Sequence, residues 1–206
     1  MDCYSRGTIY EQGGHIRMII TFDIDSILND LVPKTLTFYN THNNKNIKMS
    51  DITTYNFYDC LPKEDADGII ALFKNKELWD TLQPLPRSQD GIKKLIKKGH
   101  QVYLATATDP ANFCWKCDFI KRYFPSIPVD NIIRIMDKSM LKTDILVDDC
   151  LDNLINSLTS RICLDYPWNR SSSKDYAYDI RRAYTWNDIV NIIDNIEKEV
   201  KEWENM

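Results

Sequence analysis

The segment MIITFDID, residues 18–25, joins a short apolar run to two closely spaced acids. Residues 18–22 carry no charge and include β-branched side chains, which is typical of a strand buried on both faces of a parallel sheet. Asp23 and Asp25 follow, with one residue between them. Because alternate residues of an extended chain point to the same side, both carboxylates can enter one pocket.

The rest of the chain repeats this kind of strand and alternates it with helical patterns. Further strands are predicted at 101–106, 132–136, 144–147 and 160–164, and amphipathic helices at 89–98, 112–124, 150–158 and 186–203. Strands that alternate with helices pair in parallel through right-handed crossovers. We therefore predict an α/β fold, a Rossmann-like parallel sheet with helices on both faces.

Residues 27–85 interrupt this alternation, because they are polar and aromatic and hold no clear strand. We predict that they form a small helical cap inserted after the first strand. The core then comprises residues 18–26 and 86–206. Residues 1–17 lack an apolar centre, and we expect a leader there that can be disordered.

Composition excludes several classes of protein. The chain has 206 residues, 43% of them hydrophobic, and a net charge of -4, so no basic footprint suggests a nucleic-acid polymer as partner. No apolar run approaches the roughly 18 residues needed to span a bilayer. The six cysteines are expected to be reduced thiols in a cytoplasmic protein, because a chain of this length builds a core without disulfides.

Two of these cysteines, Cys114 and Cys117, have C-x-x-C spacing. A zinc site needs about four ligands, and no second pair or paired histidine follows. A redox motif would sit at the start of a helix in a thioredoxin-like context. We therefore interpret the pair as two small apolar positions on a helix.

Acidic and hydroxyl side chains follow three of the predicted strands, at Asp23, Asp25, Thr106, Asp148 and Asp149. Parallel strands end at one edge of a sheet, where ligands bind. Four carboxylates gathered there would repel one another without a cation, and oxygen ligands without histidine or thiolate favour Mg²⁺. Each residue alone is weak support, so the prediction depends on the ordered set.

That ordered set resembles the haloacid dehalogenase (HAD) superfamily, whose pattern is D-x-D after the first strand, Thr or Ser after the second, then a lysine and an acidic pair. The chain is further similar to the 5'(3')-deoxyribonucleotidases of cytosolic type C, over roughly residues 18–193. The segments that carry this closer resemblance are LWDTLQPLP at 78–86, VYLAT at 102–106, FIKRYF at 119–124, DK at 137–138, DILVDD at 144–149 and YTW at 184–186.

The resemblance implies the HAD fold and a Mg²⁺-dependent phosphomonoester hydrolase that acts on (deoxy)ribonucleoside monophosphates. Asp23 would be the nucleophile, forming an aspartyl-phosphate. Asp25 would protonate the leaving oxygen and then activate water. Mg²⁺ would bind the Asp23 carboxylate, the backbone carbonyl of Asp25 and Asp149, with Asp148 supporting them.

The resemblance also implies phosphate-binding residues. Thr106 would donate a hydrogen bond to a phosphate oxygen, beside Ala107, and Lys138 would pair with Asp23 and the phosphate. Lys142 is the alternative to Lys138 because it lies closer to the acidic pair, but the family spacing of ten residues favours Lys138. As a structural alternative, either lysine could be a solvated loop residue.

Two positions depart from the family pattern. Ser26 stands where the family usually has glycine after D-x-D, so the turn there is expected to differ. Ala107 and Thr108 stand where the family tends to have Ser-Pro, which removes a phosphate-facing hydroxyl. Both changes affect the expected substrate choice more than the reaction.

Aromatic residues of the predicted cap are candidates for binding a nucleotide base, because flat bases stack on aromatic rings. Tyr55, Phe57 and Trp79 are our predicted base contacts, and the alternative for each is a place in the cap core. Two other functions stay open, a HAD phosphatase for another small phosphomonoester and a catalytically silent binding protein on the same fold. Resemblance also suggests a homodimer.

Overall fold

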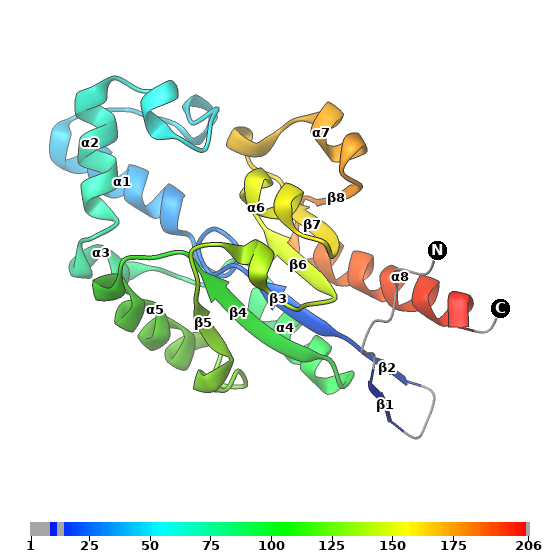
Figure 1. The fold of residues 1–206 in the computed structure, drawn as a ribbon. Coiled ribbons are helices and arrows are strands. Elements are labelled where there is room, and N and C mark those ends of the chain that lie inside the picture. Colours follow the sequence, from blue (N-terminus) through cyan, green and yellow to red (C-terminus); the bar gives the residue numbers. More distant parts are fainter. Residues whose placement is uncertain (1–8, 12–14, 205–206) are drawn as a thin grey trace.

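A computed structural model describes residues 9–11 and 15–204 of the chain. Its centre is a six-stranded sheet with the strand order β5-β4-β3-β6-β7-β8, shown in Figure 1. The strands are β3 (Ile19–Phe22), β4 (Gln101–Thr106), β5 (Ile132–Arg134), β6 (Ile145–Asp148), β7 (Ser160–Leu164) and β8 (Ile180–Ala183). All neighbours pair in parallel, which confirms the predicted sheet.

Strand β3 occupies the middle of this sheet. Ile20 lies opposite Val102 of β4 on one side and Ile145 of β6 on the other. Ile20 and Phe22 are fully buried. A strand in this position is covered on both faces, which explains why its sequence is a continuous apolar run without polar alternation.

Two details of the sheet differ from the sequence-based expectation. Strand β8 was not predicted, because Arg181 and Arg182 break its apolar pattern. It is an edge strand that pairs with β7, where half-buried arginines are tolerated. Strand β5 ends at Arg134, two residues before its predicted end.

Helices cover both faces of the sheet, as predicted. They are α4 (Ser88–Lys97), α5 (Pro110–Tyr123), α6 (Leu151–Asn156), α7 (Ser172–Ala177) and α8 (Trp186–Glu204). Ile145 and Val147 of β6 belong to the same apolar cluster as the buried side chains of α4, α5 and α8. Leu146, which points the opposite way, packs in a separate cluster with Leu154 of α6. Helix α7 begins within the run of three serines at 171–173.

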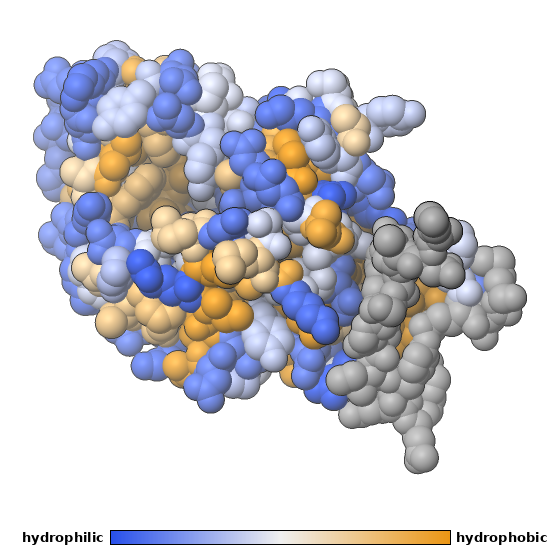
Figure 2. All heavy atoms as spheres, viewed as in Figure 1, coloured by the Kyte–Doolittle hydropathy of each residue, from blue (hydrophilic) through white to orange (hydrophobic). Residues whose placement is uncertain are grey.

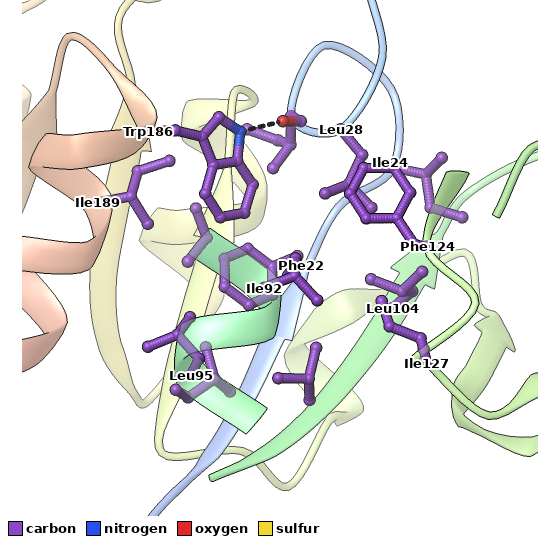
Figure 3. Close-up of a cluster of buried hydrophobic side chains, with 14 of the residues drawn as sticks. Phe22, Ile24, Leu28, Ile92, Leu95, Leu104, Phe124, Ile127, Trp186 and Ile189 are labelled. Carbon is purple, nitrogen blue, oxygen red and sulfur yellow. Dashed lines mark hydrogen bonds between the residues drawn. The ribbon is translucent and has the colours of Figure 1, made fainter. Parts of the chain in front are cut away.

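Helices α4 and α8 meet where Trp186 approaches Gly91. Figure 3 shows Trp186 among the buried apolar side chains near this contact. Trp186 stacks on Phe22 with ring centroids 5.3 Å apart, and its indole nitrogen donates to the carbonyl of Ile27 at 2.7 Å. A Cβ atom at position 91 would lie 2.7 Å from Cε3 of Trp186. Glycine is therefore required there for the close approach of the two helices.

Three α-helices lie between β3 and α4, within the predicted cap. They are α1 (Leu31–Asn43), α2 (Lys63–Leu72) and α3 (Lys76–Thr81). The chain enters and leaves this region side by side, since Asp30 N donates to Gln83 O at 3.1 Å and Leu85 N to Leu28 O at 2.9 Å. In Figure 1, α1 and α2 stand beyond the end of the sheet toward which β4 points.

Part of the predicted leader falls on described residues. Residues 1–8 and 12–14 lie outside them, while β1 (Ile9–Glu11) and β2 (His15–Arg17) form an antiparallel pair. Ile16 is buried in the main core. Among the described cysteines, Cys114 is exposed and Cys117 half-buried on α5, and both are free thiols. Within the described ranges, none of the helices is both long and apolar enough to cross a bilayer.

Candidate active site

The acidic residues predicted at the strand ends meet at one edge of the sheet. Asp23 follows β3, and its backbone N–H donates to Val147 O of β6 at 2.9 Å, which aligns the two strand ends. Asp148 is the last residue of β6, and Asp149 comes next. One carboxylate oxygen from each of Asp23, Asp148 and Asp149 lies within 4.8 Å of the others, and all three residues are buried.

A buried lysine joins two of these acids. Lys138, in a short 3-10 helix after β5, donates to Asp23 Oδ1 at 2.5 Å and to Asp148 Oδ2 at 2.7 Å. The rival candidate Lys142 is exposed on the loop before β6. The structure thus brings Lys138, and not Lys142, to the predicted nucleophile.

The acidic pair is fixed by neighbours from three segments. Asp148 accepts hydrogen bonds from Cys150 N at 2.9 Å and from the Asn153 side chain at 3.1 Å. Asp149 Oδ2 accepts from the Trp168 indole at 3.1 Å, and its backbone carbonyl accepts from the Asn169 side chain at 2.9 Å. Both carboxylates are therefore held in fixed orientations before any ligand arrives.

The electrostatics of this cluster suit a divalent cation. Burial, opposed by Lys138 and reinforced by Asp148, raises the pKa of Asp23 to about 6. Burial, then Asp148 and Asp23, raise the pKa of Asp149 well above its ordinary value. One ammonium facing three carboxylates leaves excess negative charge, and hard oxygen donors of this kind fit Mg²⁺.

Asp25 does not belong to the carboxylate cluster of Asp23, Asp148 and Asp149. Its Oδ1 accepts from the Asn29 side chain at 3.2 Å, and its Oδ2 accepts from Lys116 on α5. Lys116 also donates to Thr106 Oγ1 at 2.7 Å. Two predicted site residues, Asp25 and Thr106, are thus joined by a lysine that was not predicted.

A cavity of about 380 Å³ opens above these residues, between the core and the cap. Asp23, Asp25 and Asp149 line it from the core. From the cap and the nearby loops it is lined by Leu31, Val32, Ile52, Tyr55, Phe57, Ile70, Phe73, Trp79 and Trp168. Figure 2 shows this side of the molecule hollowed between the cap and the core, with apolar residues in the hollow.

The three predicted base contacts all line this cavity but differ in character. Tyr55 is 60% exposed, and Phe57 is half-buried with its ring 5.8 Å from that of Phe73. Trp79 is only 4% exposed, belongs to the main core and donates its indole N–H to Phe73 O at 2.8 Å. Trp79 therefore has a structural role as well as a place on the cavity wall.

Comparison with known proteins places the chain in a family. The model of the family described as 5' nucleotidase, deoxy (pyrimidine), cytosolic type C protein matches residues 17–200. The chain belongs to this nucleotidase family. The predicted phosphatase class is thereby confirmed.

Several known proteins are similar to this chain over most of its length. Two 5'(3')-deoxyribonucleotidases, from Bacillus subtilis strain 168 and Bacillus phage SPbeta, are each 27% identical over 175 residues, 84% of this chain and 97% of the relative. A haloacid dehalogenase-like hydrolase from Streptococcus pneumoniae shares the fold with a TM-score of 0.60 and 13% identity, over 86% of this chain and 98% of that chain. A hydrolase from Pseudomonas syringae gives a TM-score of 0.57 and 15% identity, over 87% of this chain and 99% of that chain. These comparisons lend no support to a homodimer.

The two departures from the nucleotidase pattern are both visible in the structure. Ser26 has a φ of 58°, in the left-handed region that favours glycine. The turn is held by Asn29, which accepts from Ser26 N at 3.1 Å, and by the Tyr166 hydroxyl, which donates to Ser26 O at 2.8 Å. Ala107 and Thr108 line the cavity.

Sequence reasoning missed four residues of this candidate site. Lys116 could have been found, because it lies at helical spacing from Asn112 and Ile120 on the buried face of α5, where a lysine is unexpected. Asn29 follows D-x-D closely but belongs to no periodic pattern. Trp168 and Asn169 lie in the loop after β7, and no spacing in the sequence connects them to Asp149.

Proposed function

We propose that the protein is a Mg²⁺-dependent phosphatase that removes the phosphate of (deoxy)ribonucleoside monophosphates through an aspartyl-phosphate on Asp23. The observation that carries this proposal is the position of Asp23. It lies on the wall of the cavity, within 4.8 Å of the Asp148 and Asp149 carboxylates, with Lys138 Nζ at 2.5 Å. A nucleophile, a cationic group and a candidate metal site thus meet at one point.

In the first step, a carboxylate oxygen of Asp23 attacks phosphorus, and the bond from phosphorus to the nucleoside oxygen breaks. Asp25 gives its proton to that leaving oxygen. Lys138 holds Asp23 Oδ1, which leaves Oδ2 available for attack, and its charge offsets the negative charge of the transferring group. Bound Mg²⁺, held by Asp23, Asp149 and the backbone carbonyl of Asp25 with Asp148 in support, would supply further positive charge to the phosphate oxygens.

In the second step, Asp25 takes a proton from water, and the water oxygen attacks the phosphorus of the aspartyl-phosphate. The bond to Asp23 breaks, and inorganic phosphate is released with the Asp23 carboxylate restored. Ala107 lines the cavity where the phosphate would lie, and the buried Thr106 directly precedes it in the chain. The loss of a hydroxyl at position 107 leaves fewer side-chain donors to the phosphate.

A nucleotide substrate is supported by the upper part of the cavity and by the family. Tyr55, Phe57 and Phe73 supply aromatic surface on the cap side, and bases stack on such surfaces. The family description and the names of the Bacillus relatives point to the same substrate class and to a cytosolic location. The net charge of -4 suits a single nucleotide held by a metal better than a nucleic-acid polymer.

The test is phosphate release from 5' and 3' nucleoside monophosphates, deoxy and ribo, alongside sugar phosphates, with Mg²⁺ or with EDTA. We expect Mg²⁺-dependent release from nucleotides. Release from sugar phosphates alone would indicate a HAD phosphatase of different specificity. Failure to release phosphate from any compound would indicate a binding protein on this fold.

A further inference from the structure

Lys116 is a buried cation whose contacts all lie inside the candidate active site. It is 2% exposed, and its helix, α5, otherwise buries Asn112, Phe119 and Ile120. A lysine in such a place loses its hydration, a cost that must be offset by partners. Its ammonium has three, the Asp25 carboxylate, the Thr106 hydroxyl at 2.7 Å and the Trp79 ring, whose centroid is 5.6 Å away.

Both oxygens of the Asp25 carboxylate are held by donors. Lys116 donates to Oδ2, and the side-chain amide of Asn29 donates to Oδ1 at 3.2 Å. Asn29 is itself fixed, since its oxygen accepts from Ser26 N at 3.1 Å and Leu31 N at 3.2 Å. The carboxylate therefore has one orientation, although its side chain is 26% exposed to the cavity.

The bond to Thr106 also has a direction. An ammonium group can only donate, so Thr106 Oγ1 accepts from Lys116. The hydroxyl proton of Thr106 is then free to be donated elsewhere, including to an oxygen of a bound phosphate. Lys116 thus holds two side chains in place, namely Asp25, which would transfer the leaving-group proton, and Thr106, which could donate to the phosphate.

We propose that Lys116 is a positioning residue for proton transfer to the leaving group, acting by holding the Asp25 carboxyl in line with the oxygen that departs from phosphorus. This inference rests on the proposed phosphatase function. In the step concerned, the bond from phosphorus to the leaving oxygen breaks while Asp25 delivers a proton to that oxygen. Lys116 itself forms and breaks no covalent bond.

The dependence of rate on the leaving group distinguishes this role from a structural one. A nucleoside hydroxyl is a poor leaving group that needs the proton, whereas p-nitrophenolate departs without it. The kcat/KM value reports the reaction only through the first irreversible step, so later hydrolysis of the aspartyl-phosphate does not affect it. A misplaced Asp25 therefore lowers kcat/KM for nucleotides much more than for p-nitrophenyl phosphate.

The experiment compares Lys116→Met with the native protein on both substrates at saturating Mg²⁺. We expect kcat/KM to fall about 100-fold for a nucleoside monophosphate and less than about 3-fold for p-nitrophenyl phosphate. Lys121→Met, an exposed position on the same helix, is the matched control and should change neither value. Lys116→Gln, which keeps a donor without the charge, provides a second variant if Lys116→Met does not fold.

Equal losses on the two substrates would overturn the proposal and assign Lys116 to phosphate binding or to folding. A native protein inactive on both substrates would overturn the proposed function instead, so the two failures are distinguishable. A series of substituted phenyl phosphates extends the test. The slope of log kcat/KM against leaving-group pKa should be steeper in Lys116→Met than in the native protein, and an unchanged slope would contradict the proposal.

Discussion

The indole nitrogen of Trp168 lies 3.1 Å from Oδ2 of Asp149, and the same ring packs in the apolar cluster of the cap with Val32, Leu36, Tyr39, Ile52 and Ile69. The ring also stacks on Tyr166, with centroids 4.3 Å apart and planes 3° from parallel. Trp168 therefore connects a carboxylate of the candidate metal site to the packing of the cap. The orientation of the Asp149 carboxylate therefore depends on how tightly the apolar side chains of the cap pack around Trp168.

Trp168→Phe should weaken Mg²⁺ binding by about 10-fold, because the ring still stacks on Tyr166 but no longer donates to Asp149, a carboxylate of the proposed metal site. The Mg²⁺-dependent rise in melting temperature, followed over a range of Mg²⁺ concentrations, measures this affinity without relying on turnover. Trp203→Phe, at a position 75% exposed on α8, is the control. Equal Mg²⁺ affinity in both variants would show that the hydrogen bond has no such role.

Asp23→Asn should abolish phosphate release, with a loss of at least about 1000-fold in kcat, because an amide cannot form the aspartyl-phosphate. Asp152→Asn, at an exposed position on α6, should keep native activity and serves as the control. Phosphate release with a nucleoside monophosphate measures both. Native turnover in Asp23→Asn would exclude Asp23 as the nucleophile.

The same variant should show a pH-dependent difference in stability when Mg²⁺ is absent. Because burial raises the pKa of Asp23 from 3.8 to about 6, the folded state holds this proton more tightly than the unfolded state. Stability from the protonated carboxyl is complete below about pH 4 and is lost as the pH rises through about 6. Asp23→Asn does not lose stability in this way, so its free energy of unfolding should rise relative to that of the native protein by about 2 kcal/mol between pH 4 and pH 7.

Urea unfolding of both proteins in EDTA at pH 4 and pH 7 measures this difference. Groups far from position 23 affect both proteins alike, so the comparison reports the Asp23 carboxyl together with Asp149, whose pKa the Asp23 charge also raises. Added Mg²⁺ at pH 7 should then stabilise the native protein more than the variant. A difference that does not change with pH would mean that the Asp23 carboxyl keeps an ordinary pKa.

The sequence predicted those parts of the site that lie at strand ends. Asp23 and Asp148 directly follow apolar runs, and parallel pairing places such ends at one edge of the sheet. The structure adds that β3 and β6 are direct neighbours, which brings these two residues together. Trp168 and Asn169 could not be predicted, because the loop after β7 has no periodicity that points to Asp149. Strand β8 was missed for a related reason, since an edge strand with arginines lacks the apolar signal of the central strands.

The composition of the cap did not predict which of its aromatic rings line the cavity. Aromatic residues in residues 27–85 indicated a place for a base, but the sequence could not separate cavity-lining rings from core rings. Trp79 turned out to be almost wholly buried, while Phe57 keeps part of its ring accessible at the cavity. Only the packing of α2 and α3 against the core decides between these outcomes.

Phe57→Ala should therefore raise KM for nucleoside monophosphates by about 10-fold with little change in kcat, since base stacking on an aromatic ring contributes about 1–3 kcal/mol per base. Deoxyribose 5-phosphate, which has no base, provides the control substrate, and its kinetics should stay unchanged. Tyr58→Ala, at a neighbouring exposed position, is the control variant. An equal rise in KM for both substrates would place the effect in the cap fold and not in base binding.

Gly91→Ala should destabilise the fold by about 1–3 kcal/mol, although alanine is the better helix former, because overpacking outweighs propensity. The added methyl group would lie 2.7 Å from Cε3 and 3.0 Å from Cζ3 of Trp186, whose ring is held by its stacking on Phe22 and its hydrogen bond to Ile27. Urea unfolding measures the change, and Lys93→Ala, exposed on the same helix, should alter stability by less than about 0.5 kcal/mol. Because Ile27 lies four residues after Asp23, displacement of Trp186 should also lower activity below that of the Lys93 variant. A Gly91→Ala protein as stable as the native one would show that α4 and α8 can separate without cost, contrary to the packing in the structure.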